Sequence, residues 1–153
     1  MTPHQHRAGF TLIEVLILVV IMAILAGTIL PRFLNTTEDA KTSSMTHSLN
    51  VLESQIEIYR AQHLNQYPTI QDNALPQLTK STNAAGEIGT SKTDYPLGPY
   101  LLESPVNPFD GSKNVVEVAV QGQKPTAVVG NLGGWQYDPS TGAIYPNNSE
   151  YYQ

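Results

Sequence analysis

The amino-acid sequence predicts an α+β protein, in which a long N-terminal helix packs on a small C-terminal antiparallel β-sheet. Three observations support this fold class. An apolar run near the N terminus has the length of a helix, the segment after it carries apolar residues at spacings of three and four, and short β-branched or aromatic segments separated by turns follow in the last third of the chain. Helical patterns that precede strand patterns, without alternating with them, are typical of α+β domains.

The first predicted element is an apolar helix that begins at Phe10. From Phe10 to Leu30 the segment has 21 residues and carries one charge, Glu14. A helix needs about 20 residues to cross a bilayer core of about 30 Å, so we expect one membrane span within residues 10–34. A secretory signal peptide is cut after its apolar run, whereas the Gly9-Phe10 junction precedes this one. The apolar helix should therefore survive processing.

Glu14 is out of place in such a helix, because an ionised carboxylate at the centre of a membrane costs about 2.5–3.5 kcal/mol. If the chain is cut after Gly9, the new amino terminus at Phe10 is a cation in the same layer. A neighbouring copy of the chain could then place its amine against Glu14. Alternatively, Glu14 lies at the level of the lipid headgroups and extends its carboxylate toward water.

The apolar helix has a predicted weak point between Gly27 and Pro31. Pro31 has no N–H to donate to the carbonyl of Gly27, and glycine is itself a poor helix former. The segment Asn35-Thr36-Thr37-Glu38 has the form of an N-cap with a glutamate three residues later, so that a second helix could begin there. Either the chain kinks or melts locally, or a continuous helix carries a mild proline bend.

The second helical pattern runs from Glu38 to His63. Its apolar stripe should lie on a sheet. The stripe consists of Met45, Leu49, Leu52, Ile56, Tyr59 and His63. Val51 and Ile58 fall beside it, where they would either widen the buried face or contact a neighbouring subunit.

Turn residues dominate after the helix. The pattern predicts a short helical turn at 74–79, an irregular loop at 86–108 and a turn at Asn107-Pro108-Phe109-Asp110-Gly111. Four short strands are expected to form an antiparallel meander against the helix. They span residues 115–120, 126–129, 135–137 and 143–145.

Composition limits the functions that the chain can have. The 153 residues leave room for one soluble domain after the apolar helix, and the absence of cysteine excludes a disulfide framework. The net charge is −5, and would be −6 without Arg7, so no nucleic-acid partner is expected. His4 and His6 form no convincing metal site. No nucleophile elbow, phosphate loop or metal-ligand spacing is present, so no catalytic residue and no enzyme activity are predicted.

The segment Gly-Phe-Thr-Leu-Ile-Glu-Val-Leu, from Gly9 to Leu16, resembles the class III signal of the type IV filament superfamily, which comprises type IV pilins and the pseudopilins of type II secretion. The resemblance implies that residues 1–9 are a leader. A prepilin peptidase would cut between Gly9 and Phe10 and methylate the Phe10 amine. Glu14 would pair with that amine on an adjacent subunit during assembly. Pro31 also falls where many members have a proline.

The C-terminal half resembles the major pseudopilin family more loosely, in Gly98-Pro99-Tyr100-Leu101 and in the turn at 107–111. The lack of cysteine also favours a pseudopilin or a pilin without a disulfide. Many members of that family bind calcium through a late loop rich in aspartate. This chain has no clear aspartate cluster, and calcium usually takes six to eight oxygens. Asp110 and Asp138 are therefore expected to be turn formers; no metal is predicted, and calcium is a lesser alternative.

The sequence thus predicts a structural subunit of a helical homo-oligomeric filament, with residues 10–34 as the membrane and filament-core helix and residues 35–153 as a pilin-like domain. The resemblance implies a single pass through the bacterial inner membrane with the N terminus in the cytoplasm. It also implies three partners: a prepilin peptidase, an inner-membrane platform and its assembly ATPase. A short periplasmic pseudopilus that drives protein export is favoured over a surface pilus for adhesion, motility or DNA uptake. The alternative of another class is a signal-anchored binding protein with Tyr151 and Tyr152 as contacts, although a loose tail or a subunit interface is the favoured role of these residues.

Overall fold

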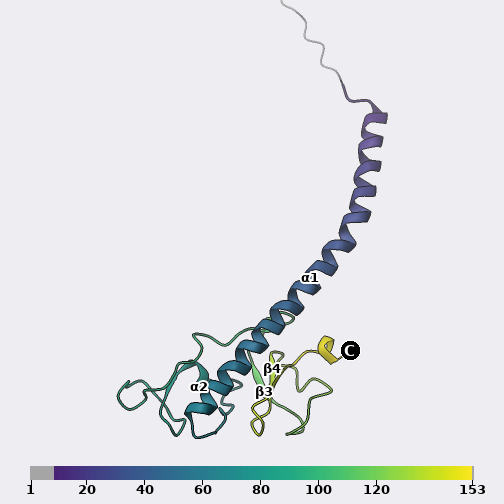
Figure 1. Cartoon of the computed structure of the whole chain (residues 1–153). Coiled ribbons are helices and arrows are strands. Elements are labelled where there is room, and N and C mark those ends of the chain that lie inside the picture. Colours follow the sequence, from purple (N-terminus) through teal and green to yellow (C-terminus); the bar gives the residue numbers. More distant parts are fainter. Residues whose placement is uncertain (1–8, 153) are drawn as a thin grey trace, which may run out of the picture. The chain divides into compact units, whose positions relative to one another are not determined.

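The computed structural model describes residues 9–152, without the side chains of residues 28–36 and 150. The chain divides into two compact units, Met1–Ala40 and Lys41–Gln153. The long helix α1 (Leu12–Gln62) contributes residues to both (Figure 1). The expected order of a long helix followed by small sheets is confirmed, and the fold class is α+β.

The described part of the first unit consists of Gly9 to Thr11 and the beginning of α1. The backbone of α1 is helical through the predicted weak point, but the side chain of Pro31 lies outside the described residues. No helix in the described part of the chain is both long enough and apolar enough to cross a membrane. The side chains of residues 28–34, which belong to the predicted span, are not described.

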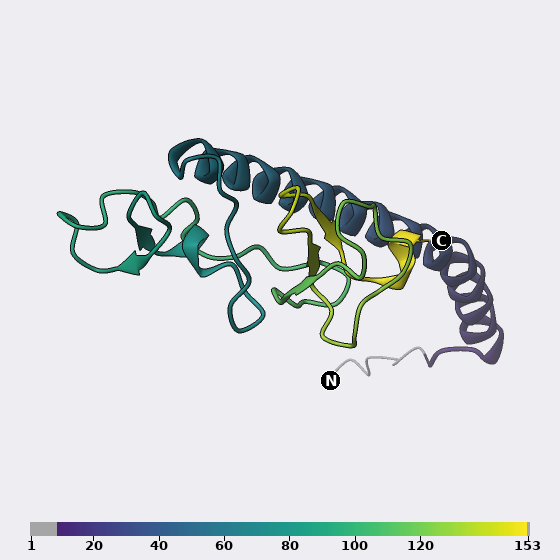
Figure 2. The same cartoon turned by 90° about the horizontal axis from the view of Figure 1, so that it is seen from below.

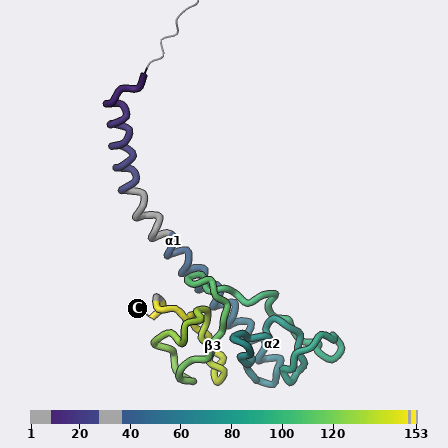
Figure 3. The backbone as a smooth tube through the Cα atoms, turned by 180° about the vertical axis from the view of Figure 1, so that it is seen from behind, coloured from purple at the N-terminus to yellow at the C-terminus, as the bar shows by residue number. Residues whose placement is uncertain are grey.

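The second unit packs short elements around the C-terminal part of α1. The helix α2 (Pro76–Thr79) and the strands β3 (Val115–Glu117) and β4 (Trp135–Tyr137) follow one another along this part of α1 (Figures 1 and 3). Figure 2 shows the strands beneath this part of the helix. The remaining elements are β1 (Ser81–Thr82), β2 (Ile88–Gly89), β5 (Ile144–Pro146) and a final 3-10 helix, η1 (Ser149–Tyr152).

The main sheet has the strand order β3-β4-β5. Strands β4 and β5 pair antiparallel, as predicted, with Tyr137 opposite Ile144. Strand β3 pairs parallel to β4, with Val115 opposite Trp135, so the expectation of a fully antiparallel meander is wrong at this strand. The cause is the long connection through residues 118–134, which returns the chain to the end of the sheet where it began; parallel neighbours require such a crossover.

The predicted strand at 126–129 does not form, because side chains bind the backbone groups that a strand would use. The amide of Gln136 donates to the carbonyl of Ala127 at 2.9 Å. The amide of Asn147 accepts from the N–H of Val129 at 2.9 Å and donates to its carbonyl at 3.0 Å. The β-branched composition of this segment was therefore misleading. Three of its backbone groups are thus satisfied without a ladder.

The predicted helix stripe is the centre of the hydrophobic core. Its members are buried, except for Leu49, which is partly buried against the others. They pack on Leu75, Leu78, Val115, Trp135, Tyr137 and Ile144. Of the two flanking residues, Val51 is half-buried and Ile58 is 43% exposed. Ile58 does not widen the core, which leaves the contact with a neighbouring subunit as its remaining predicted role.

His63 connects the end of α1 to strand β1. Its ring stacks on Tyr59 with 3.7 Å between the ring centroids, and its Nδ1 atom lies 2.7 Å from the carbonyl of Tyr59. Because a carbonyl only accepts, Nδ1 carries the hydrogen. In the neutral ring Nε2 then accepts from the hydroxyl of Thr82, 2.9 Å away. The histidine is thus a satisfied core residue, as the stripe predicts.

Candidate functional site

The predicted processing site lies immediately before the first turn of α1. Gly9 and Phe10 have no regular secondary structure, and the side chain of Phe10 is 77% exposed. No atom lies within 4 Å of the position that a Cβ atom would take on Gly9. The junction between the two residues is therefore an open, irregular segment that ends where the helix begins.

Thr11 and Glu14 form a capping box at the start of α1. The N–H and the hydroxyl of Thr11 both donate to Oε2 of Glu14, at 3.2 and 3.1 Å. The N–H of Glu14 donates in return to Oγ1 of Thr11 at 3.3 Å. Such a reciprocal arrangement satisfies backbone donors that the first helical turn would otherwise leave unpaired. The carboxylate of Glu14 thus has partners within its own chain.

The position of Glu14 is also favourable for its charge. The aligned peptide dipoles place partial positive charge at the N terminus of a helix, and an anion in the first turn gains about 0.3–1 kcal/mol from it. Together with the two hydrogen bonds from Thr11, this field lowers the cost of carrying a carboxylate in an apolar segment. It does so before any second copy of the chain is present.

The helix that follows carries a large uncovered apolar surface. All its large apolar side chains between residues 12 and 25 are at least 47% exposed in the described structure. They are Leu12, Ile13, Val15, Leu16, Ile17, Leu18, Val19, Val20, Ile21, Met22, Ile24 and Leu25. Soluble monomers rarely expose continuous apolar patches larger than a few hundred Å², so this surface requires either lipid or other protein around it.

Asp110 and Asp138 have the geometry of turn formers. Asp110 accepts from the N–H of Ser112 at 2.7 Å and from the N–H of Gly134 at 2.9 Å. Asp138 accepts from the N–H of Ser140 at 2.9 Å and from the N–H of Gly122 at 2.6 Å. Both oxygens of each carboxylate are therefore occupied by backbone amides. Among the described residues, no three His, Cys, Asp or Glu side chains gather in a group that could hold a metal ion.

The environment of Asp138 stabilises its charged form. Desolvation of this carboxylate by burial would raise its pKa, but hydrogen bonds from Ser140 and from the backbone N–H of Gly122 oppose that effect and hold the pKa below its ordinary value of 3.8. The carboxylate therefore remains ionised at neutral pH, where it holds the backbone of two turns.

The C-terminal tyrosines are part of the domain. The hydroxyl of Tyr152 donates to the carbonyl of Pro146 at 2.7 Å and accepts from the amide of Gln136 at 2.9 Å. Burial raises the pKa of Tyr152 to about 12, and the neighbouring Tyr151 and Tyr145 contribute smaller effects in the same direction. The interpretation of these residues as a loose tail is wrong for Tyr152, which is bonded within its own chain.

The structure therefore brings Gly9, Phe10 and Glu14 together on one short segment. Gly27 lies farther along α1, with no atom within 4 Å of the place that a Cβ atom would occupy, and Pro31 lies outside the described side chains. Thr11 is the residue that sequence reasoning missed. The signal was present, because Thr11-Leu12-Ile13-Glu14 has the threonine-to-glutamate spacing of a capping box.

Comparison with known proteins finds similarity both in the N-terminal motif and along most of the chain. Residues 4–30 match the family described as the prokaryotic N-terminal methylation motif. The chain is 30% identical over 149 residues to the type II secretion system core protein G of Vibrio cholerae, which covers 96% of this chain and 95% of the relative. It is 27% identical over 119 residues to the protein of the same name from Klebsiella michiganensis, covering 78% of this chain and 80% of the relative. It is also 27% identical over 113 residues to that from Escherichia coli, covering 69% and 77%. No solved structure matches.

Proposed function

Because the chain belongs to the family of type II secretion system core protein G, the major pseudopilins, we propose that it polymerises into a short periplasmic pseudopilus that drives protein export. Members of this family are structural subunits and not enzymes. The observation that carries the proposal is the match to the Vibrio cholerae protein over 96% of the chain, since it includes the C-terminal domain as well as the N-terminal motif. Surface pilus and tethered binding protein are correspondingly less favoured.

Processing is proposed to occur at the bond between Gly9 and Phe10, with methylation of the Phe10 amine. The N-terminal methylation motif that covers residues 4–30 supports this position. The exposure of Phe10 and the open surroundings of Gly9 are consistent with access by a prepilin peptidase. Residues 1–9 would be the leader, residues 10–34 the membrane and filament-core helix, and residues 35–153 the periplasmic domain.

Glu14 is proposed to gain a second partner during assembly. In the isolated subunit its Oε2 accepts two hydrogen bonds from Thr11. In the polymer the methylated amine of Phe10 from an adjacent copy would add a charged partner. Because the helix carries this carboxylate into an apolar layer, gaining a cation there is worth more than it would be in water.

The apolar surface of residues 12–25 is proposed to lie first in the inner membrane and then in the core of the polymer, with the N terminus in the cytoplasm. Extraction from lipid requires energy that this chain does not supply. We therefore expect an inner-membrane platform and a cytoplasmic ATPase as partners, besides the prepilin peptidase. The turn between Gly27 and Pro31 is proposed as the place where the helix kinks or melts locally during this step.

Mass spectrometry of the N-terminal peptide, in washed membranes and in the material sheared from the same cells, tests the proposal. The expected result is a methylated Phe10 terminus confined to the membrane fraction. A methylated Phe10 terminus abundant in the sheared fraction would instead indicate a surface pilus. An uncut Met1 terminus in both fractions would overturn the filament function.

A further inference from the structure

The domain has a polar recess at the outer edge of its two-stranded sheet. The recess has a volume of about 380 Å³ and is lined by Tyr59 of α1, by Gln77 of α2 and by residues of the segments 66–71 and 85–88. The last of these residues, Ile88, belongs to β2. Four separate parts of the chain thus converge on one small volume.

One wall of the recess begins where α1 ends. The N–H of Asn65 donates to the carbonyl of Arg60 at 3.1 Å, which is the hydrogen bond that spans a Schellman motif. Leu64 is the left-handed residue of this motif, with a φ of 55°. The motif turns the chain out of the helix, so that the segment 66–71 can line the recess together with Tyr59.

Tyr59 brings a buried hydroxyl to the recess. Its side chain is 2% exposed, and the hydroxyl has no hydrogen-bond partner among the described residues. A Cβ atom on Gly86 would lie 2.6 Å from this oxygen, so the glycine keeps the space beside the hydroxyl open. A buried hydroxyl without a hydrogen bond is unfavourable, and in the isolated domain only water in the recess can bind it. The hydroxyl is therefore available to a ligand.

The outer edge of β2 supplies a peptide N–H and carbonyl to the same recess. Thr82 of β1 lies opposite Ile88, but the N–H and carbonyl of Thr82 bond to Leu97, at 2.9 and 3.0 Å. Opposite residues of an antiparallel pair exchange both hydrogen bonds or neither, so the two backbone groups of Ile88 face away from β1. In the described structure β2 pairs with β1 alone. This edge is therefore unpaired.

The other polar groups of the recess are mostly uncharged. Gln77 is 4% exposed, and Thr69 fixes its amide: the N–H of Thr69 donates to Oε1 at 3.2 Å, and the Thr69 hydroxyl accepts from Nε2 at 2.8 Å. Glu87 is the one charged residue that lines the recess. Its carboxylate repels an acidic ligand and leaves uncharged or basic ones favoured.

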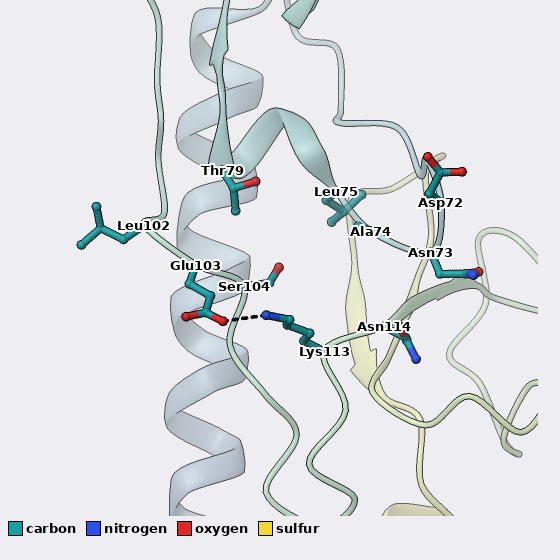
Figure 4. A pocket seen from close by; sticks show the side chains of 10 residues that line it. All are labelled: Asp72, Asn73, Ala74, Leu75, Thr79, Leu102, Glu103, Ser104, Lys113 and Asn114. Carbon is teal, nitrogen blue, oxygen red and sulfur yellow. Dashed lines mark hydrogen bonds and ion pairs between the residues drawn. The ribbon is translucent and has the colours of Figure 1, made fainter.

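A second recess of similar size lacks these features. It is lined by residues of the segments 72–79, 102–104 and 113–114 (Figure 4). Its one buried side chain is the apolar Leu75, and its charged residues Lys113 and Glu103 bind each other, with 2.6 Å between Nζ and Oε1. A buried polar group that awaits a ligand is thus found beside β2 and not there.

The groups beside β2 fit an extended peptide. The N–H and carbonyl of one edge residue match the carbonyl and N–H of a peptide residue that lies opposite it, which is how a strand is added to a sheet. The same edge of a second copy would form a closed two-fold contact, which cannot continue into a helical polymer. The unpaired edge and the absence of a lining cation therefore favour a non-acidic segment of another protein.

We propose that an extended, non-acidic peptide segment of a partner protein adds to the outer edge of β2. Its main chain pairs with Ile88, and an uncharged polar group of the segment bonds to the hydroxyl of Tyr59. The inference goes beyond the proposed function and does not rest on it, because the site lies within one copy of the domain.

Selection of short random peptides displayed on phage, with the full-length chain in detergent as target, supplies the probe. Tyr59→Phe removes only a hydroxyl without a partner, so the unfolding temperature should change by less than about 2 °C. The affinity for the selected peptide, measured by fluorescence anisotropy, should fall about three- to tenfold. Tyr145→Phe makes the same chemical change on β5, outside the recess, and should bind like the wild type. Wild-type affinity of the Tyr59→Phe chain would overturn the site.

Amide hydrogen exchange of the same full-length chain tests the pairing. The bound peptide should slow exchange at Ile88 by at least about tenfold, whereas Gly89, which lies opposite Ser81 within the ladder, should not change. A peptide that is N-methylated at its pairing residue should not bind. Unchanged exchange at Ile88 in the complex would place the peptide elsewhere and overturn the proposal.

Two further outcomes would assign the edge to another occupant. Protection of Ile88 that rises with the concentration of the chain, without peptide, would mean that a second copy covers the edge. Protection by N-acetylglucosamine, which carries an amide group on a sugar, but by none of the selected peptides would indicate a glycan site. Either result overturns the peptide proposal, and neither bears on the formation of the polymer.

Discussion

The N–H of Thr11 lies 3.2 Å from Oε2 of Glu14, and the N–H of Glu14 lies 3.3 Å from Oγ1 of Thr11, so that each residue caps the other at the start of α1. This relationship separates two roles of the glutamate. Glutamine at the same position can accept the bonds of a capping box but carries no charge. Glu14→Gln should therefore retain the first helical turn and lose polymer assembly, because only the charged side chain attracts the Phe10 amine.

Amide hydrogen exchange at residues 12–15 of the full-length chain in detergent measures the first turn, and pelleting of polymer measures assembly. Thr11→Ala should give the opposite result at the helix start, with protection lowered by about 1 kcal/mol. Thr46→Ala is the matched control, since its hydroxyl donates to the carbonyl of Thr42 within the helix and takes no part in the cap. Assembly of the Glu14→Gln chain at the wild-type level would contradict a role for the charge.

Asp138 should make the domain sensitive to acid. Its pKa is held below 3.8 in the folded chain, so the stabilisation that it provides is complete above that pH and is lost as the pH falls through the lower folded-state value. Asp138→Asn should lower the unfolding temperature at pH 6 and show a weaker decline as the pH falls below 3.8. The fluorescence of Trp135, the single tryptophan, follows unfolding of the full-length chain. The exposed Asp94→Asn is the control, and an equal decline in wild type and Asp138→Asn would refute the assignment.

Tyr152 should confer sensitivity to alkali. Its pKa is raised from 10.0 to about 12, so its contribution to stability is complete below pH 10 and is lost as the pH rises toward 12. Tyr152→Phe removes the bond to the carbonyl of Pro146 and should lower the free energy of unfolding at pH 7 by about 1 kcal/mol. Its stability should also decline less between pH 10 and pH 12. Tyr151→Phe, next in sequence, serves as the comparison and is expected to behave as wild type in denaturant titrations at pH 7.

His63 and Thr82 should be energetically coupled. His63→Phe keeps a ring that can stack on Tyr59, but it leaves the carbonyl of Tyr59 and the hydroxyl of Thr82 without their histidine partner, at a cost of about 1–3 kcal/mol. Combining it with Thr82→Val should cost less than the sum of the two single changes by at least about 0.5 kcal/mol. Denaturant titration of the four chains completes the cycle. Additive effects would show that the hydrogen bond contributes little, and the exposed His47→Gln should change nothing.

The helical half of the fold could be predicted because its apolar residues repeat at helical spacing along one continuous segment of the chain. The stripe from Met45 to His63 gave the buried face of α1, and the turn residues gave the position of the hairpin of β4 and β5. Two features were out of reach. The direction of β3 depends on the path of a long connection, and the segment at 126–129 has the composition of a strand but is bound by side chains of Gln136 and Asn147, which lie later in the chain.

The residues of the candidate site could be predicted from the sequence to a similar extent. Gly9, Phe10 and Glu14 stand in a short motif, so the roles proposed for them follow from the order of residues alone. The capping role of Thr11 was readable from its spacing to Glu14 but was missed. The left-handed backbone of Leu64 had no sequence signal at all, because glycine or asparagine is what such a position normally displays.

The connection through residues 118–134 keeps its path through contacts to its main chain. Asp138 binds the N–H of Gly122, Gln136 binds the carbonyl of Ala127, and Asn147 binds Val129. Every residue type except proline offers the same N–H and carbonyl groups. The outward-facing side chains of this connection can therefore diverge between bacterial lineages while its shape is inherited, which gives the subunit a surface on which new specificities can evolve without refolding the domain.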